Sequence, residues 1–306
     1  MNTKKQTLFM MFGVMIVTLA CSLVSGGPVP TQTPQPQSDQ VDEVATAVAA
    51  TMQALTVAPV ENVPTQAEAP TQQTSGIPVS FGNVSFIIPE GLANGATPEA
   101  VPASTEEQGG PWGVAPAHVK FTLTGYRLQN KFHEPGIYIY PAPEYAAVHP
   151  GAADQIKITA NILAGGPLQK ETLPIIPFFN AGPLFAANMQ MIKFQNGLGV
   201  RALTQYAQYS APINNHELFY HFEGLTADNQ YYIIAILPIT APVLAETSQL
   251  DAVIPADGVP FPGDMEPNET YYFSVTEKLN SLSPDAFMPA LNMLDLLMES
   301  ILVTNT

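Results

Sequence analysis

The hydrophobic pattern changes character along the 306 residues of the chain. An apolar run occupies 8–20, and polar, proline-rich sequence follows it. Short apolar segments separated by turn residues then fill 76–306. That last region is long enough to bury a sizeable core of its own. The sequence therefore predicts a leader at 1–20, a linker at 21–75 and a single globular domain at 76–306.

Several apolar segments of the domain have the pattern of β-strands. The runs at 189–194 and 200–206 flank an Asn-Gly turn, and those at 217–225 and 231–237 flank a polar loop, so each pair predicts a hairpin. The run at 231–237 is apolar at every position, which is typical of a strand buried on both faces. Further strands are expected at 79–88, 118–123 and 136–140.

Helical periodicity supplies the elements that would cover this sheet. The spacing predicts a helix at 150–164 with Ala160 on its buried face, and another at 283–301, although Pro289 would break or kink it. The segment 268–282 fits either a helix or a strand. The order of elements predicts an α+β fold with a mainly antiparallel sheet covered by helices. It is similar to the α/β/α sandwich of photosystem extrinsic-type proteins.

The N-terminus has the features of an export signal. Lys4 and Lys5 precede the apolar run, whose length of about 13 residues is too short to span a bilayer. The segment 18–21 resembles the lipobox of bacterial lipoproteins, although Thr18 stands where that family usually has Leu, Val or Ile. The resemblance implies that Cys21, the only cysteine, is acylated after cleavage. An ordinary signal peptide with an incidental cysteine is the alternative.

The linker is rich in Pro, Thr and Gln, which cannot bury enough apolar surface to form a core. It is expected to be an extended, disordered tether. A short alanine-rich helix is predicted within it at 41–55. The lipobox, the tether and the segment at 44–51 resemble the N-termini of surface lipoproteins from bacteria of the green non-sulfur type. That resemblance implies an extracytoplasmic protein held on the membrane by lipid, and it implies no activity.

Candidate chemistry in the domain centres on one strand. His216 and His221 are five residues apart and do not fit the four-residue spacing of zinc proteases. His221 and Glu223 share one face of the predicted strand. With Arg201 from the neighbouring hairpin they form the candidate ligand-binding set Arg201, His221 and Glu223. The alternative is a solvated sheet face. No catalytic residue, metal site or cofactor is predicted.

Two loops carry further alternatives. Carboxylates in the segment 249–270 would suit calcium, but the spacing of a calcium-binding loop is absent, so an acidic surface loop is preferred. The glycine-rich segment 109–113 holds Trp112, the only tryptophan. Trp112 is expected to plug into the core, with stacking on a sugar as the alternative.

Net charge narrows the class of partner. The formal charge is −16, and removal of 1–20 would remove Lys4 and Lys5 and no acidic residue, leaving −18. Such a surface repels nucleic acid and anionic lipids and attracts cations or basic partners. The sequence thus favours a non-enzymatic binding or envelope-associated lipoprotein, for a protein or small-molecule ligand at the cell surface. A hydrolase-like enzyme with an unrecognised site and a solute-binding lipoprotein of a transporter are the alternatives.

Overall fold

The structure is a computed structural model that describes residues 75–249, 251–263 and 268–305. The predicted leader, the lipidation site at Cys21, the tether and the helix expected at 41–55 lie outside these ranges. Within them, no helix has both the length and the apolar content needed to cross a membrane.

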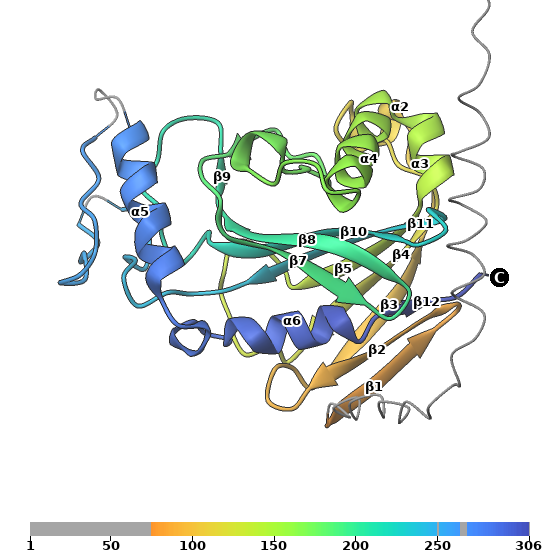
Figure 1. Ribbon diagram of the computed structural model, residues 1–306, viewed down its shortest axis with the longest axis horizontal. Coiled ribbons are helices and arrows are strands. Elements are labelled where there is room, and N and C mark those ends of the chain that lie inside the picture. The colour runs from red at the N-terminus through yellow and green to blue at the C-terminus, as the bar shows by residue number, and fades with distance from the viewer. Residues whose placement is uncertain (1–74, 250, 264–267, 306) are drawn as a thin grey trace, which may run out of the picture. The chain divides into compact units, whose positions relative to one another are not determined.

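Seven strands of the described chain form one antiparallel sheet (Figure 1). They are β3 (Gly95–Val101), β4 (His118–Thr124), β5 (Gly136–Pro141), β7 (Ala187–Phe194), β8 (Gly197–Thr204), β10 (Phe219–Thr226) and β11 (Tyr231–Pro238). Their spatial order is β3-β4-β5-β11-β10-β8-β7. Both predicted hairpins are confirmed, because β7 pairs with β8 and β10 pairs with β11.

A smaller antiparallel sheet joins two segments that are far apart in the sequence. Its strands, in spatial order, are β1 (Gly76–Phe81), β2 (Val84–Pro89) and β12 (Leu302–Val303). The single strand expected at 79–88 is wrong, because the chain reverses at Gly82-Asn83 and pairs β1 with β2. Gly82 has a φ of +59°, which glycine adopts without steric cost. A two-residue ribbon pairs β6 (Gly182–Pro183) with β9 (Tyr206–Ala207).

Helices cover the large sheet from both sides. They are α2 (Glu106–Gly109), α3 (Ala142–Val148), α4 (Pro150–Leu163), α5 (Glu269–Ser281) and α6 (Leu291–Glu299). In Figure 1, α3 and α4 lie over one face, while α6 and the smaller sheet lie under the other. Helices and mainly antiparallel sheets together make this an α+β fold, as the sequence predicts.

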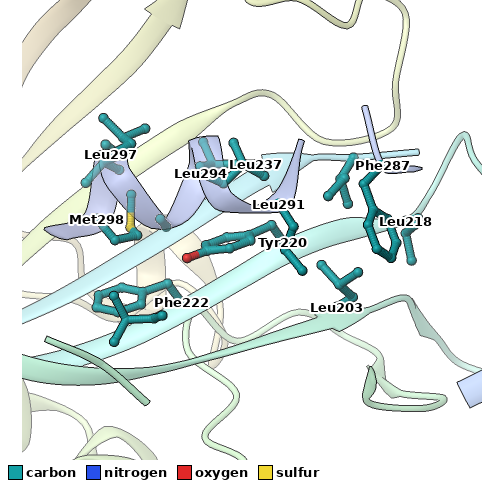
Figure 2. Close-up of a cluster of buried hydrophobic side chains, with 14 of the residues drawn as sticks. Leu203, Leu218, Tyr220, Phe222, Leu237, Phe287, Leu291, Leu294, Leu297 and Met298 are labelled. Carbon is teal, nitrogen blue, oxygen red and sulfur yellow. The ribbon is translucent and has the colours of Figure 1, made fainter. Parts of the chain in front are cut away.

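The strand β11 is buried on both faces, as its unbroken apolar sequence predicts. Its alternate side chains enter two separate hydrophobic clusters. Tyr232 and Ile234 join the cluster beneath α3 and α4, whereas Leu237 joins the cluster that contains α6. Figure 2 shows Leu237 and Leu294 of α6 within that second cluster. The covering of both faces explains why the strand needs no polar alternation.

Two helices differ from the sequence-based expectation in instructive ways. The helix α4 forms where predicted, starting at Pro150 and ending before Gly165, whose φ is +96°. Its buried residues include Ile162, whereas Ala160, expected on the buried face, is exposed. The second expected helix does not run through Pro289. Because proline lacks an amide hydrogen, α6 begins after it, at Leu291.

The ambiguous segment at 268–282 is helical. It forms α5, whose buried residues Tyr271, Val275 and Leu279 repeat at four-residue intervals. That spacing places all three on one helical face. The helix α5 also reaches the site described next.

Candidate functional site

A cleft of about 810 Å³ opens beside the strand β9. Its walls come from segments that are far apart in the sequence, at 132–133, 179–181, 206–212, 248–249 and 261–263. A volume of this size is within the usual range for small-molecule sites, roughly 300–1,000 Å³. The cleft is therefore the candidate ligand-binding site of the domain.

Aromatic rings form much of the cleft surface. Phe179 and Tyr206 meet edge to face, with ring centroids 5.7 Å apart. His133 lies 5.4 Å from Phe179 and packs on the buried Phe219 at 4.4 Å. Tyr209 is also part of the lining and is 74% exposed. The rings under the cleft are thus fixed by mutual packing, and Tyr209 offers a solvent-facing ring at its rim.

Helix α5 holds one wall of the cleft in place. The hydroxyl of Tyr272 accepts a hydrogen bond from the amide of Ala211 at 3.0 Å. The hydroxyl of Tyr271 accepts one from the amide of Ile213 at 2.8 Å. Since these are backbone contacts, the path of the wall does not depend on the side chains that line it.

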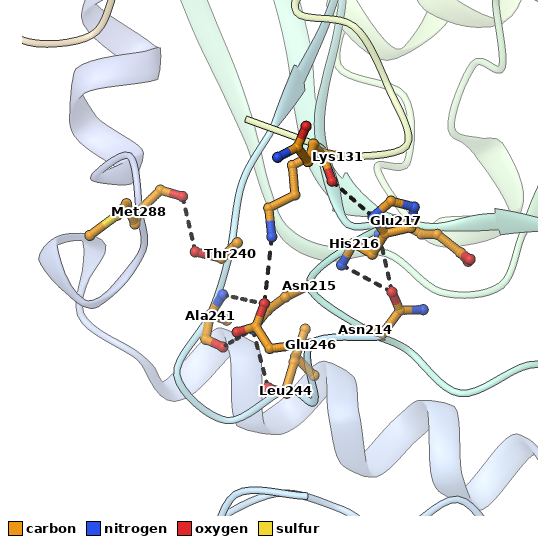
Figure 3. Close-up of polar contacts among 11 residues, drawn as sticks. Lys131, Asn214, Asn215, His216, Glu217, Thr240, Ala241, Leu244, Glu246 and Met288 are labelled. Atoms are coloured by element: carbon orange, nitrogen blue, oxygen red, sulfur yellow. Dashed lines mark hydrogen bonds and ion pairs between the residues drawn. The ribbon is translucent and has the colours of Figure 1, made fainter. Parts of the chain in front are cut away.

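A network of asparagine and charged side chains supports the segment that carries Glu217 (Figure 3). The Asn214 Oδ1 atom accepts hydrogen bonds from the amides of His216 and Glu217, at 3.0 and 3.1 Å. Asn215 bonds the backbone of Ala241 through both its oxygen and its nitrogen. Figure 3 shows the Glu217 side chain extending away from this network. Glu217 is one of the residues that line the cleft.

The predicted residues His221 and Glu223 lie together below the cleft, buried on the face of β10 that carries the α4 cluster. His221 is 7% exposed and Glu223 is 1% exposed. The expectation of a solvated sheet face is therefore wrong. Glu223 Oε1 lies 3.2 Å from His221 Nε2. Neither residue lines the cleft.

The polar atoms of this pair are engaged by the protein. Glu223 Oε1 accepts a hydrogen bond from the amide of Ile176 at 2.7 Å, and His221 Nε2 lies 2.9 Å from the carbonyl oxygen of the same residue. The hydroxyl of Tyr232 donates to Glu223 Oε2, and Thr159 Oγ1 lies 2.5 Å from that hydroxyl. The pair thus clamps the backbone at Ile176, three residues before the cleft residue Phe179.

Burial determines the protonation of these groups. It raises the pKa of Glu223 well above its ordinary value, against the opposing effects of the hydrogen bonds from Tyr232 and Ile176. Burial also lowers the pKa of His221 to about 4, against the effect of the Ile176 carbonyl. The pKa of His133 is lowered to about 4 by burial, with smaller contributions from His221 and His216. A neutral histidine in the cleft lining therefore adds no positive charge near pH 7.

The structure separates Arg201 from the other two predicted residues. Arg201 lies opposite Phe222 in the sheet, so it is on the other face of β10 from His221 and Glu223. Its Nε atom is 3.0 Å from Asp295 Oδ1 of α6, and its side chain is 5% exposed. The three residues therefore do not form one site.

Trp112 also differs from expectation. Trp112 is 52% exposed instead of buried in the core, and it borders a second groove beside Phe178 and Phe179. Among the residues that the structure describes, no three or more His, Cys, Asp or Glu side chains gather as a metal site would require. Asp264 and Glu266 of the acidic loop lie outside the described ranges.

The aromatic residues of the cleft were missed by sequence reasoning, although two local signals mark them. The segment 205–209 carries two tyrosines among amides, and 178–180 carries two phenylalanines before an asparagine. Together with the fold, they define an α+β protein with an aromatic-lined cleft. Comparison with protein-family models, with curated proteins and with solved structures finds no match in any of the three.

Proposed function

We propose that this protein is an extracytoplasmic lipoprotein, anchored through Cys21, whose domain at 76–306 is a non-catalytic binding module. The lipobox-like segment and the Pro/Thr/Gln-rich tether support the anchor. The aromatic cleft supports the binding role. In this proposal the large sheet is the middle layer of an α/β/α sandwich, and the tether holds the cleft away from the membrane.

The proposed binding role rests on one observation, which is that the buried pair His221 and Glu223 does not line the cleft. A general acid or base must come within hydrogen-bonding distance of its substrate. His221 and Glu223 instead hold the backbone of Ile176, and neither reaches the cleft surface. The aromatic rings, the amides and Glu217, which do line the cleft, suit recognition of a ligand. A solute-binding lipoprotein of a transporter is the second candidate, favoured by the volume of the cleft.

The binding role is tested by thermal unfolding of the full-length chain in detergent, with panels of sugars, peptides, metabolites and metals. A ligand that binds only the native state raises the melting temperature. We expect one class to do so, and Ala181→Trp, which fills the cleft, to abolish the effect. Lys193→Trp on the exposed side of β7 is the matched control and should respond like the wild type. A shift that survives Ala181→Trp would place binding elsewhere.

The anchor requires a separate experiment. Cys21→Ala should abolish labelling with palmitate and release the protein from the membrane fraction of the expressing cells. The domain should melt as before, because the substitution lies outside it. Labelling that persists in the variant would overturn the assignment of Cys21.

A further inference from the structure

We propose that the cleft selects an organic cation, such as a quaternary ammonium group carried on a larger molecule. This inference rests on the proposed binding role of the cleft and names its ligand class. It is carried by one carboxylate, Glu217, that lines the same cleft as several aromatic rings. Three features of the molecule support it.

The first feature is the charge of the lining. Glu217 is an acidic residue of the cleft, and no lysine or arginine is present among the described residues that line it. In the same described ranges, no ion pair involves Glu217. By contrast, the nearby Glu246 is paired with Lys131. The charge of Glu217 is therefore available to a ligand.

The second feature is that the Glu217 carboxylate is held at one oxygen. Its Oε2 atom accepts a hydrogen bond from Gln205 Nε2 at 2.9 Å. Gln205 is fully buried and is itself fixed, since it donates to the Pro212 carbonyl and accepts from the Asn214 amide. The carboxylate is thus positioned before a ligand arrives, which reduces the entropy lost on binding.

The third feature is the set of rings that line the same cleft as Glu217. Tyr206 follows Gln205 directly in the chain, and its ring stands at 89° to that of Phe179. Phe132 and Tyr209 add exposed rings to the lining. Aromatic faces attract cations that lie within about 6 Å of the ring centroid. Rings and a carboxylate together are the chemistry that recognises a methylated ammonium group.

A bare metal ion is a poorer fit to the same cleft. Calcium requires six to eight oxygen ligands at close range, and Glu217 is not part of any cluster of metal-ligating side chains in the described residues. An anionic ligand would meet a carboxylate and the net charge of −16 without a compensating cation in the lining. The volume of about 810 Å³ leaves space for an organic body attached to the charged group.

The experiment compares choline with 3,3-dimethyl-1-butanol, which has the same shape without the charge. Binding of both to the full-length chain is measured by titration calorimetry at low salt. We expect choline to bind about tenfold more tightly than the alcohol, which corresponds to about 1.4 kcal/mol. Glu217→Gln should reduce that preference, because only the attraction of choline to the rings remains, and should leave the affinity for the alcohol unchanged. Glu246→Gln is the matched control and should preserve the preference.

The outcomes separate this inference from the proposed function. Equal affinity for the two probes, no binding of choline at millimolar concentrations, or an unchanged preference in Glu217→Gln would each overturn the cationic ligand class. If a neutral or anionic ligand then shifts the melting temperature and Ala181→Trp abolishes the shift, the binding role stands without it. If no compound in the melting experiment raises the melting temperature, the binding role itself is overturned.

Discussion

Two buried polar clusters lie on opposite faces of β10, and they handle charge differently. On the α6 face, Arg201 forms a two-point contact with Asp295, and the Tyr220 hydroxyl donates to the same carboxylate. On the α4 face, the one salt-bridge partner of Glu223 among the described residues is His221, and burial lowers the pKa of that histidine to about 4.

The difference shows that the identity of the partner decides whether a buried carboxylate keeps its charge. An arginine cannot give up its proton, so it remains a counter-charge after burial. The Arg201 guanidinium opposes the rise in the pKa of Asp295 that burial causes. A histidine can become neutral, and the pKa of Glu223 then stays well above its ordinary value. We therefore expect an ion pair on one face and a largely uncharged network on the other near pH 7.

The largest effect should come from breaking the ion pair. Asp295→Ala leaves the Arg201 guanidinium buried without its counter-charge and should lower the free energy of unfolding by about 4 kcal/mol. Urea denaturation at pH 7 measures the loss. The double variant Arg201→Met with Asp295→Leu should recover most of it, since a well-packed apolar pair avoids the desolvation cost. A loss below about 1 kcal/mol in the single variant would mean that the pair is solvated.

The second effect comes from removing the carboxyl group on the α4 face. Glu223→Ala leaves the Ile176 amide and the Tyr232 hydroxyl without their partner, which should cost about 3 kcal/mol. The Ile176 amide should also exchange its hydrogen faster than in the wild type. The isosteric Glu223→Gln is the control and should cost clearly less near pH 7. Equal losses in the two variants would mean that the charge of Glu223 matters there.

How far the sequence could predict these clusters depends on what fixes each contact. His221 and Glu223 are two residues apart in one strand, so alternation alone places them on one face. Arg201 belongs to β8, which is joined to β10 through the long segment 205–218 instead of a tight turn. Strand register is then set by tertiary packing, and a shift of one residue would have moved Arg201 to the other face.

The cleft was beyond sequence reasoning for a related reason. Local patterns predicted the hairpins and α4, because turn residues and periodicity act over a few positions. The cleft joins segments as distant as 132–133 and 261–263, and only the completed fold brings them together. The exposure of Trp112 likewise depends on neighbours that are remote in the chain.

The pH dependence of stability provides a sharper test of the uncharged network. Because the pKa of Glu223 is raised on folding, its contribution is fully present below pH 4.5 and is lost as the pH rises toward the native pKa. For His221, whose pKa is lowered, stability is instead lost as the pH falls from 6.5 toward about 4. The two trends oppose each other between about pH 4.5 and 6.5, and only the Glu223 trend continues above that range.

Glu223→Gln isolates this trend. Relative to the variant, the wild type should lose stability as the pH rises above about 4.5, by at most about 1.4 kcal/mol per pH unit, until Glu223 ionises in the native state. Denaturation curves of both proteins between pH 5 and 9 give the difference directly. The same replacement at the exposed Glu277 should leave a curve parallel to the wild type. A constant difference between Glu223→Gln and the wild type would show that Glu223 is already ionised when buried.

The smallest expected effect comes from removing one hydroxyl group that is hydrogen-bonded to Glu223, and it is compared with the removal of a buried hydroxyl that is not. Tyr232→Phe removes the hydroxyl shared by Glu223 and Thr159 and should cost about 1 kcal/mol. Because that hydroxyl lowers the native pKa of Glu223, its loss should extend the pH-dependent decline of stability to higher pH. Tyr126→Phe is the matched control, since the Tyr126 hydroxyl is also buried but donates to the Pro238 carbonyl. Tyr126→Phe should lower the free energy of unfolding by a similar amount without changing its pH dependence. If the two variants have identical pH profiles, the Tyr232 hydroxyl does not influence the protonation of Glu223.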